Sequence, residues 1–402
     1  MAADPLPIEE ARRLVLDAVE PLDAESVPIE RARSRVLAEA VASAADVPPF
    51  VSSAMDGFAV PTGESGPLRI TGESRAGHPF AGRVEPGTAV RISTGAVVPE
   101  GTGAVAMVEA SVEADGTVTV PDLEAGANIR GAGEDIRRGQ TVLEPGVPLG
   151  AAALGVAASI GRSQVVCARL PRVALLATGD ELAAPGAPLG PGQIHSSNTP
   201  VLAALVEGAG GRVILGADVP DTAAGTRAAL GRAIEEADVV CVTGGVSVGS
   251  HDHVKDAFAE LGVRERFWRV ALKPGKPTWF GVGPAGERRV ACFGLPGNPV
   301  SAAVTFILFV RPALRALQGA DPSTTRIRAE LTEAVPRLTE RTQALRCRLR
   351  AGTGGWQVTP TGPQGSHQLT SMLGADALAI VAPGEGELAP GDPVEAELLD
   401  RG

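Results

Sequence analysis

Three stretches decide the fold: PRVALLATGDEL at 171–182, DVVCVTGG at 238–245 and VACFGLPGNPVS at 290–301. Each contains a short run of mostly apolar residues that ends at or near glycine. Runs of this kind, bounded by turn residues, are typical of strands buried inside a sheet. The same reasoning predicts further strands at 212–215, 267–272 and 278–282.

Helical stretches are expected between these strands, at 198–209, 221–236 and 253–261. The first two begin at residue types that commonly cap helices, Asn198 and Asp221. A longer apolar helix begins at Asn298, and we expect it to bend or break before Pro312 because proline removes a backbone donor. Alternation of strand and helix predicts a mostly parallel sheet with helices on both faces.

The chain has 402 residues, and a single core rarely exceeds about 250–300 residues. Apolar positions at helical spacing over 8–20 and 28–42 predict two N-terminal helices, and short β-prone runs between turns follow them. We therefore expect an α/β multidomain protein with a central α/β unit, a β-rich insert and a C-terminal β-barrel-like module. The expected boundaries are 1–44 plus 140–170 for a helical and linker subdomain I, 45–139 for β-rich subdomain II, 171–319 for α/β subdomain III and 320–402 for β subdomain IV.

The composition excludes several classes of partner. A net charge of −11 argues against nucleic acid and anionic membranes, and 3% aromatic residues with no tyrosine leave few platforms for stacked bases. The N-terminus lacks the features of a signal peptide, and the longest apolar stretch, around 304–310, is shorter than the roughly 20 residues of a membrane span. Four well-separated cysteines indicate buried thiols in a reducing compartment. We expect a cytoplasmic protein that binds no nucleic acid and no membrane.

Lysine is used sparingly. Only three of the 36 basic residues are lysines, and two of them lie in Lys273-Pro274-Gly275-Lys276-Pro277. Because a lysine carries a compact, strongly hydrated charge, this turn is suited to present two ammonium groups to an anion. The alternative is a solvated loop. The third lysine, Lys255, is expected on the exposed face of a short helix.

Four glycine-containing segments follow predicted strands of the α/β unit: Thr178–Glu181, Thr243–Gly249, Lys273–Pro277 and Gly294–Ser301. Ligands of such sheets bind at the carboxyl ends of the strands. Backbone N–H groups, the helix start at Asn298 and both lysines would then lie along one edge, and a helix N-terminus favours an anion. The pattern predicts a phosphate-type or oxyanion site.

Asp180, Glu181, Asp221 and Asp252 are expected at the same edge. Carboxylates repel a phosphate unless a cation bridges them, and Mg²⁺ fits because it prefers a few carboxylate oxygens together with phosphate and water. Asp221 and Asp252 have an alternative role as helix caps.

Two segments outside the α/β unit also carry carboxylates in tight turns. Asp56 lies within Ser52–Val60, and Asp135 lies within Asn128–Ile136. A carboxylate bracketed by small and apolar residues suggests a partner, and the alternative is local stabilisation of the turn.

Taken together, these residues resemble the molybdopterin molybdenumtransferase family, which includes bacterial MoeA and the E domain of gephyrin. The resemblance implies a molybdenum-cofactor-binding fold in an elongated homodimer of four subdomains. The matching segments follow the family's order along nearly the whole chain: Ser53–Val60, Arg91–Gly95, Asn128–Ile136, Thr178–Leu182, Gly244–Gly249 with Asp252, Lys273–Pro277, Gly294–Ser301 and Gly365–Ser371.

The resemblance also implies Mg²⁺-dependent insertion of molybdate into adenylylated molybdopterin with release of AMP. It implies contacts with the molybdopterin adenylyltransferase and with molybdoenzymes. The catalytic residues would be Asp56, Asp135, Glu181, Asp221, Asp252, Lys273 and Lys276, with Glu181, Asp221 and Asp252 holding the metal. The substrate-binding residues would be Thr94, Gly244, Gly245, Ser247, Pro274, Pro277, Pro296, Asn298, Pro299, Ser301, Arg346 and Ser371. Arg346 and Ser371 belong to the β module, which in this family closes the cleft from the partner subunit.

Two other functions remain open at this point. ATP-dependent adenylylation of molybdopterin uses the same α/β unit, and the gephyrin E domain also serves as a scaffold. The additional N- and C-terminal units and the sequence Gly244-Gly245-Val246-Ser247 favour insertion. The lysines and carboxylates of the expected cleft argue against a pure scaffold.

Overall fold

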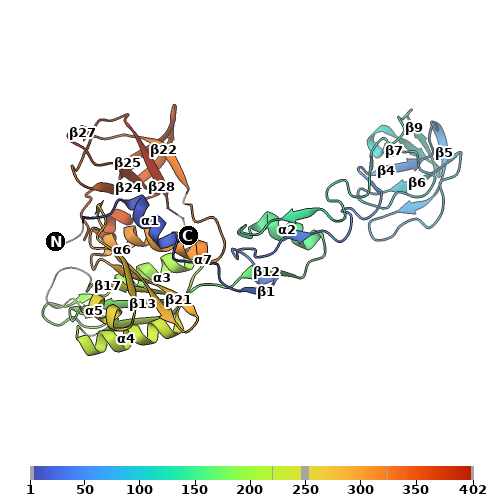
Figure 1. Ribbon diagram of the computed structural model, residues 1–402. Coiled ribbons are helices and arrows are strands. Elements are labelled where there is room, and N and C mark those ends of the chain that lie inside the picture. The colour runs from blue at the N-terminus through green and yellow to red at the C-terminus, as the bar shows by residue number, and fades with distance from the viewer. Residues whose placement is uncertain (1–3, 220, 246–252, 324, 400–402) are drawn as a thin grey trace.

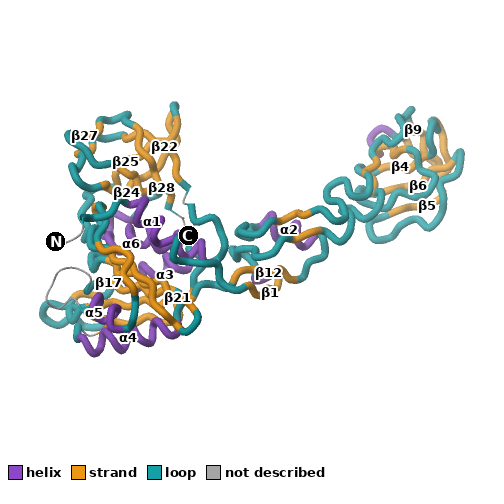
Figure 2. The backbone as a smooth tube through the Cα atoms, viewed as in Figure 1, coloured by secondary structure: helices purple, strands orange, loops and turns teal. Residues whose placement is uncertain are grey.

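The computed structural model describes residues 4–219, 221–245, 253–323 and 325–399. The molecule is elongated (Figures 1 and 2). The α/β unit and the C-terminal module form a body, and a thin arm connects this body to a β unit at the far end.

A six-stranded sheet forms the centre of the α/β unit. Its strand order is β16-β13-β17-β21-β20-β18. The first four of these strands are parallel, and β20 and β18 are antiparallel to their neighbours. The mostly parallel sheet is therefore confirmed. The bounds are β13 Arg172–Thr178, β16 Arg212–Val219, β17 Val239–Thr243, β18 Arg264–Trp268, β20 Trp279–Ala285 and β21 Arg288–Leu295.

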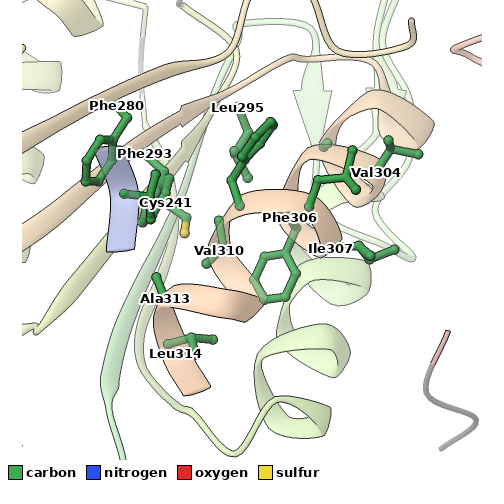
Figure 3. Packing of buried hydrophobic residues seen from close by; sticks show 14 of the residues in the cluster. Cys241, Phe280, Phe293, Leu295, Val304, Phe306, Ile307, Val310, Ala313 and Leu314 are labelled. Carbon is green, nitrogen blue, oxygen red and sulfur yellow. The ribbon is translucent and has the colours of Figure 1, made fainter. Parts of the chain in front are cut away.

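Helices cover both faces of this sheet, because successive strand side chains point to opposite sides. Leu175 packs in one core with α1, α3, α6 and α7, which Figure 3 shows in part. Leu176, the next residue, packs in a second core with α4 and α5. The bounds are α1 Ile8–Leu16, α3 Asn198–Gly208, α4 Ala223–Glu236, α5 Val254–Glu260, α6 Pro299–Thr305 and α7 Arg311–Leu317.

The long apolar helix spans Pro299–Leu317 and is interrupted by one π-helical turn, η3, at Phe306–Val310. The expected irregularity before Pro312 therefore takes the form of a π turn, not a break. This helix is long and apolar enough to cross a membrane, with a mean hydropathy of 1.6. Since 89% of its apolar window is buried inside the protein, it is a core helix.

The arm consists of two antiparallel strand pairs and one helix. β1 (Ala24–Pro28) pairs with β12 (Gln164–Ala168), β2 (Val41–Ala42) pairs with β11 (Thr141–Leu143), and α2 (Ala151–Ser159) packs beside them. The expected helix at 28–42 is wrong, since this segment holds only a short 3₁₀ turn, η1 (Ile29–Arg31), and irregular chain before β2. The first N-terminal helix exists, but α1 lies in the core of the α/β unit and not in the arm.

The distal unit is a six-stranded, mostly antiparallel sheet with the order β7-β4-β6-β5-β9-β8. A short pair, β3 (Ser52–Ser53) with β10 (Ile129–Arg130), joins it to the arm. The remaining bounds are β4 Gly57–Val60, β5 Gly66–Ser74, β6 Thr88–Ile92, β7 Ala104–Met107, η2 Val108–Ala110, β8 Val112–Ala114 and β9 Thr117–Val120.

The C-terminal module is a β barrel. Strands β24, β25, β22, β28 and β26 pair in turn, and β26 pairs back with β24 to close the ring. β19 (Leu272–Lys273), from the α/β unit, adds to the edge of β24. The other bounds of the module are β22 Arg326–Leu331, β23 Val335–Pro336, β24 Thr342–Gly352, β25 Gly355–Pro360, η4 Leu369–Met372, β26 Ala377–Val381, β27 Glu387–Leu388 and β28 Pro393–Leu398. The α/β unit also contains a short parallel pair, β14 (Leu182–Ala183) with β15 (Ile194–His195).

A buried carboxylate joins this barrel to the helical layer. Glu397 of β28 is fully buried and receives hydrogen bonds from Arg12 of α1 at 2.6 Å and from Arg311 of α7 at 2.9 Å. Because both arginines come from the α/β unit, these hydrogen bonds fix the position of the barrel relative to that unit. The barrel segments beside the central sheet are therefore held next to its edge.

Candidate active site at the carboxyl edge of the central sheet

The strand register brings the predicted loops to one edge. β16, β13, β17 and β21 are parallel, so their carboxyl ends meet there. Trp279, the first residue of β20, pairs with Gly294 near the end of β21, and Trp268, the last residue of β18, pairs with Trp279. The turn Lys273–Pro277 connects β18 to β20 and therefore lies at this same edge.

Glycine allows the strand ends to approach one another closely. Gly244 has φ 84°, its N–H donates to the Leu295 carbonyl at 3.2 Å, and a Cβ added there would lie 2.7 Å from the Thr178 carbonyl oxygen. Gly245 has φ 63°, and an added Cβ would lie 2.6 Å from Val254 Cγ2. The ends of β13, β17 and β21 therefore form a tight floor of backbone.

The lysine turn has a buried base and exposed charges. Gly275 is buried, and a Cβ added to it would lie 2.5 Å from Thr305 Cγ2. Thr278, which is fully buried, donates its hydroxyl to the Gly275 carbonyl at 2.6 Å. Lys273 and Lys276 are exposed, and neither forms an ion pair with a carboxylate in the described part of the chain. The prolines of the turn, Pro274 and Pro277, are buried and half-buried.

The start of α6 lies beside this turn and is held from two sides. The Asn298 side-chain amide donates to Ser366 Oγ at 3.1 Å, and the Val300 N–H donates to the Ser366 carbonyl. The Asn198 side-chain amide donates to the Gly297 carbonyl at 2.7 Å, and its Oδ1 is buried without a hydrogen-bond partner among the described residues. Pro296, Pro299 and Ser301 are buried or half-buried around this helix start.

Asn198 and Ser366 are site residues that the sequence reasoning missed. Asn198 was expected to cap α3, but Ser197 occupies the capping position and Asn198 is the first residue of the helix. An asparagine that follows a strand loop at the sheet edge would have been a usable signal. Ser366 lies inside the matched segment Gly365–Ser371, but the spacing of residues in the sequence does not predict its contacts with Asn298 and Val300.

The C-terminal module brings a buried arginine to the same region. Arg346 is fully buried, its Nε donates to Ser371 Oγ at 3.1 Å and its Nη2 donates to the Gly365 carbonyl at 3.3 Å. Its Nη1 has no partner among the described residues. Burial lowers the pKa of Arg346 to about 10, which leaves it charged at neutral pH.

The resemblance implied that this module closes the cleft from the partner subunit, but in the structure it lies against the sheet edge of its own chain. Ser366 contacts Asn298 and Val300 of the same chain, and β24 pairs with Lys273 of the same chain. One chain therefore places its own Arg346 and Ser371 next to its own lysine turn.

The carboxylates at the edge form an incomplete group in the described residues. Glu181 folds back over Gly179, so that its Oε2 lies 2.4 Å from where a Cβ on that glycine would be, and Asp180 accepts a hydrogen bond from the Asp221 N–H at 3.2 Å. The capping alternative for Asp221 is wrong, because Thr222 caps α4. Asp252 and Ser247 lie outside the described residues, so their predicted roles stay predictions.

Mg²⁺ is compatible with this donor set. Within the described residues no group of three His, Cys, Asp or Glu side chains is placed to hold a metal ion. Glu181 and Asp221 nevertheless supply carboxylate oxygens at the tips of neighbouring strands. Mg²⁺ usually takes only one or two carboxylates and completes its shell with water and phosphate.

Three predicted residues lie elsewhere. Asp56 and Thr94 adjoin in the distal unit, where Asp56 Oδ1 accepts a hydrogen bond from the Thr94 N–H at 2.8 Å. Asp135 is exposed in the arm-side loop, where its N–H donates to the Val47 carbonyl at 3.1 Å. Figure 1 shows this end of the molecule far from the central sheet. The structure therefore divides the predicted site into an edge group and a distal group within one chain.

A separate cavity of about 380 Å³ lies at the opposite, amino-terminal edge of the sheet. It is lined by charged residues that include Arg169, Asp238 and Arg288, which are paired with one another. It contains none of the predicted site residues. We place the candidate chemistry at the carboxyl edge, where cations are exposed.

Comparisons with known proteins identify the family of this chain. Three family models cover most of the chain: the MoeA N-terminal region (domain I and II) at 6–161, a probable molybdopterin binding domain at 174–316 and the MoeA C-terminal region (domain IV) at 328–399. The molybdopterin molybdenumtransferase of Haemophilus influenzae is 37% identical over 404 residues, which cover 98% of each chain. This chain belongs to the MoeA family.

Other relatives extend the likeness. The molybdopterin molybdenumtransferase 2 of Mycobacterium tuberculosis is 36% identical over 96% of this chain and 98% of its own. The crystal structure of the molybdopterin biosynthesis MoeA protein from Pyrococcus horikoshii superposes with a TM-score of 0.82 at 29% identity, covering 98% of this chain and 99% of that one. The chain is a transferase of molybdenum cofactor biosynthesis.

Proposed function

We propose that the protein catalyses Mg²⁺-dependent insertion of molybdate into the dithiolene of adenylylated molybdopterin, with release of AMP. The observation that carries this proposal is the meeting of three elements at one sheet edge: the lysine turn, the start of α6 and the Arg346–Ser371 pair. Molybdate is a dianion and the protein has a net charge of −11. A local cationic site is therefore needed to hold it against the overall field.

The edge residues have distinct roles in this proposal. Lys273 and Lys276 bind the oxygens of molybdate or of the substrate phosphates, and Ser301 and the amides at the start of α6 donate hydrogen bonds. Arg346 supplies a cation inside a dry environment, where its interaction with an anion is stronger than in water. Removing one such preorganised contact typically lowers the rate by about 10²–10³.

Glu181, Asp221 and Asp252 are the residues that would hold Mg²⁺. When bound, the ion supplies Lewis-acid stabilisation of the negative charge on the departing AMP. Glu181 and Asp221 sit at the tips of β13 and β16, beside the glycine floor. This placement supports a role next to the phosphates of a ligand that lies on that floor.

A homodimer explains the distal group. Asp56 and Thr94 adjoin in the distal unit, and Asp135 lies in the loop between β10 and β11. Figure 1 shows the arm between the distal unit and the α/β unit. A second copy of the chain would bring its distal group to this edge, which gives two equivalent sites under a two-fold axis. We further propose that the enzyme acts in the cytoplasm and contacts the molybdopterin adenylyltransferase and molybdoenzymes.

The test is release of AMP from adenylylated molybdopterin by the full chain, with and without molybdate. We expect release to require molybdate and Mg²⁺, and Lys276→Ala to reduce it by about 10²-fold or more. Arg232→Ala, which removes an exposed cation on α4, is the matched control and should leave the rate unchanged. Pyrophosphate release from ATP and molybdopterin without molybdate would instead identify the adenylylation step, and full activity of Lys276→Ala would refute the assigned site.

A further inference from the structure

The third lysine also lies at the carboxyl edge. Lys255 Nζ is 3.5 Å from the centroid of the Trp268 ring, and the Arg269 guanidinium carbon is 4.1 Å from the same centroid. Trp268 ends β18 opposite Trp279, next to the lysine turn. The expectation that Lys255 sits on a plain exposed helix face is therefore incomplete, because one indole gathers two cations here.

The backbone of Arg269 is fixed in a conformation unusual for its residue type. Its φ is 75°, in the left-handed region that side chains other than glycine rarely adopt. Its N–H donates to the Thr278 carbonyl at 2.9 Å, and its carbonyl accepts from the Leu6 N–H at 3.1 Å. The next residue, Val270, donates to the Lys276 carbonyl at 3.0 Å. Hydrogen bonds of its N–H and its carbonyl group therefore hold the Arg269 backbone in place, directly beside the lysine turn.

Neighbouring carboxylates do not neutralise the Arg269 charge. In the described residues Arg269 has no ion pair, and its side chain is half-buried. The nearest acidic residue on the strand, Glu265, accepts a hydrogen bond from Trp279 Nε1 at 2.6 Å. An anion bound at Arg269 would form charge-assisted hydrogen bonds with its guanidinium group.

We propose that Arg269 and Lys255, held on Trp268, form a second anion subsite beside the lysine turn, and that it takes the phosphate of a nucleoside monophosphate. This proposal rests on the proposed function only in naming AMP as the nucleotide. Arg269 contacts the phosphate, and Trp268 is a positioning residue that fixes both cations. The lysine turn then remains available for a second anion, molybdate, at the same edge.

The experiment is calorimetric titration of the full-length protein with AMP and, separately, with inorganic phosphate. We expect Arg269→Asn to weaken AMP binding at least about tenfold, since a lost charge-assisted hydrogen bond has an effect of this size. Asparagine is chosen because it tolerates the left-handed backbone. Arg269→Lys should restore much of the affinity, and Lys255→Gln should weaken it.

Arg266→Gln is the matched control, because Arg266 is exposed on the same strand, β18, and has no contact with the Trp268 ring centre. If Arg269→Asn weakens the binding of both AMP and inorganic phosphate, the subsite recognises the phosphate group. If Arg269→Asn leaves phosphate binding unchanged, recognition of the phosphate group by this subsite is refuted. AMP binding of Arg269→Asn equal to that of the parent, or no AMP binding by the parent, also overturns the subsite. An Arg269-dependent AMP affinity without molybdate-dependent AMP release would leave the subsite standing and refute the proposed function.

Discussion

At the scale of single residues, the Thr278 hydroxyl holds the lysine turn. Thr278→Val keeps the shape of the side chain but leaves the buried Gly275 carbonyl without its 2.6 Å donor. An unsatisfied buried acceptor costs about 1–3 kcal/mol, and the turn can relieve this only by moving. We expect the molybdate concentration for half-maximal AMP release to rise severalfold, while the rate at saturation changes less.

Thr305→Val is the control for this change. The Thr305 hydroxyl donates to the Ser301 carbonyl within the helix, and its methyl group, which packs on Gly275, is kept in valine. This variant should keep the parent's molybdate dependence. Equal effects of the two substitutions would show that the threonine hydroxyl of the turn has no special role.

The sequence predicted the edge residues whose position follows from a strand end. Lys273 and Lys276 qualify, because a turn between two strands of a known sheet has only two edges to occupy. Asn198 and Ser366 were missed because their partners, Gly297 and Asn298, are distant in sequence and depend on tertiary packing. The left-handed backbone of Arg269 has no sequence signal either, since arginine rarely adopts it.

At the scale of elements, one buried carboxylate joins the arm to the sheet. Asp238 precedes β17, and its side chain is only 3% exposed. It accepts hydrogen bonds from Arg169, which follows β12 of the arm, at 2.7 Å, and from Arg172 and Arg288 of the α/β unit. Asp238→Asn removes the charge that these three arginines share. We expect the free energy of unfolding to fall by about 2 kcal/mol, less than the 3–5 typical of fully buried pairs because the arginines are partly hydrated.

The pH dependence of this effect has a definite sign. Burial alone would raise the pKa of Asp238, but the hydrogen bonds from Arg169 and Arg172 outweigh it and hold the pKa well below its usual range. A lowered carboxyl pKa adds stability above the ordinary pKa of about 4, and this stability is lost as pH falls below that value. Denaturant unfolding of parent and variant should therefore differ by a constant amount from pH 8 to pH 5, and by less below about pH 4.

Asp17→Asn is the control for Asp238→Asn. Asp17 pairs with Arg13 on α1, and both side chains are about 60% exposed. Exposed pairs contribute about 0–1 kcal/mol, so this variant should unfold almost like the parent. An Asp238→Asn protein as stable as the Asp17→Asn protein would contradict a structural role for the arginine cluster.

The elements themselves were predictable to different degrees. Buried strands such as β13 and β17 carry an unmistakable apolar signal, because both of their faces are covered. The apolar residues of 28–42 have helical spacing, but no α-helix forms there. Ala24–Pro28 pairs with β12, and this tertiary contact and the turn that follows it outweigh the local helical preference. The placement of α1 in the core of the α/β unit includes a hydrogen bond from Arg12 to Glu397, 385 residues away in sequence, that no local pattern encodes.

At the scale of the whole molecule, the arm separates two groups of predicted residues. The edge group includes Lys276, which lies between β19 and β20, and the distal group includes Asp56, which directly precedes β4. Asp56 is exposed at the far end, and the residues around it include exposed apolar side chains at Met55, Met107 and Val108. Clustered exposed apolar side chains are typical of a surface that binds another protein, and a second chain that packs there would cover them.

Complementation between two inactive variants tests this composite site. Asp56→Asn keeps an intact edge and loses the distal carboxylate, and Lys276→Ala keeps the distal group and loses the edge charge. If each site combines the edge of one chain with the distal group of its partner, a mixed dimer has one intact site and one doubly defective site. Random exchange of subunits should then restore about one quarter of the parent activity, because half of the dimers are mixed and each has one working site.

The mixture is prepared by co-expression of differently tagged chains, so that sequential purification on both tags isolates the mixed dimer. The isolated mixed dimer should show about half of the parent rate of AMP release. Each variant alone, carried through the same purification, should stay near its own low rate. A mixed dimer as inactive as the two variant homodimers would mean that Asp56 and Lys276 of different chains do not share a site. The length of the arm would then have no role in assembling the active site.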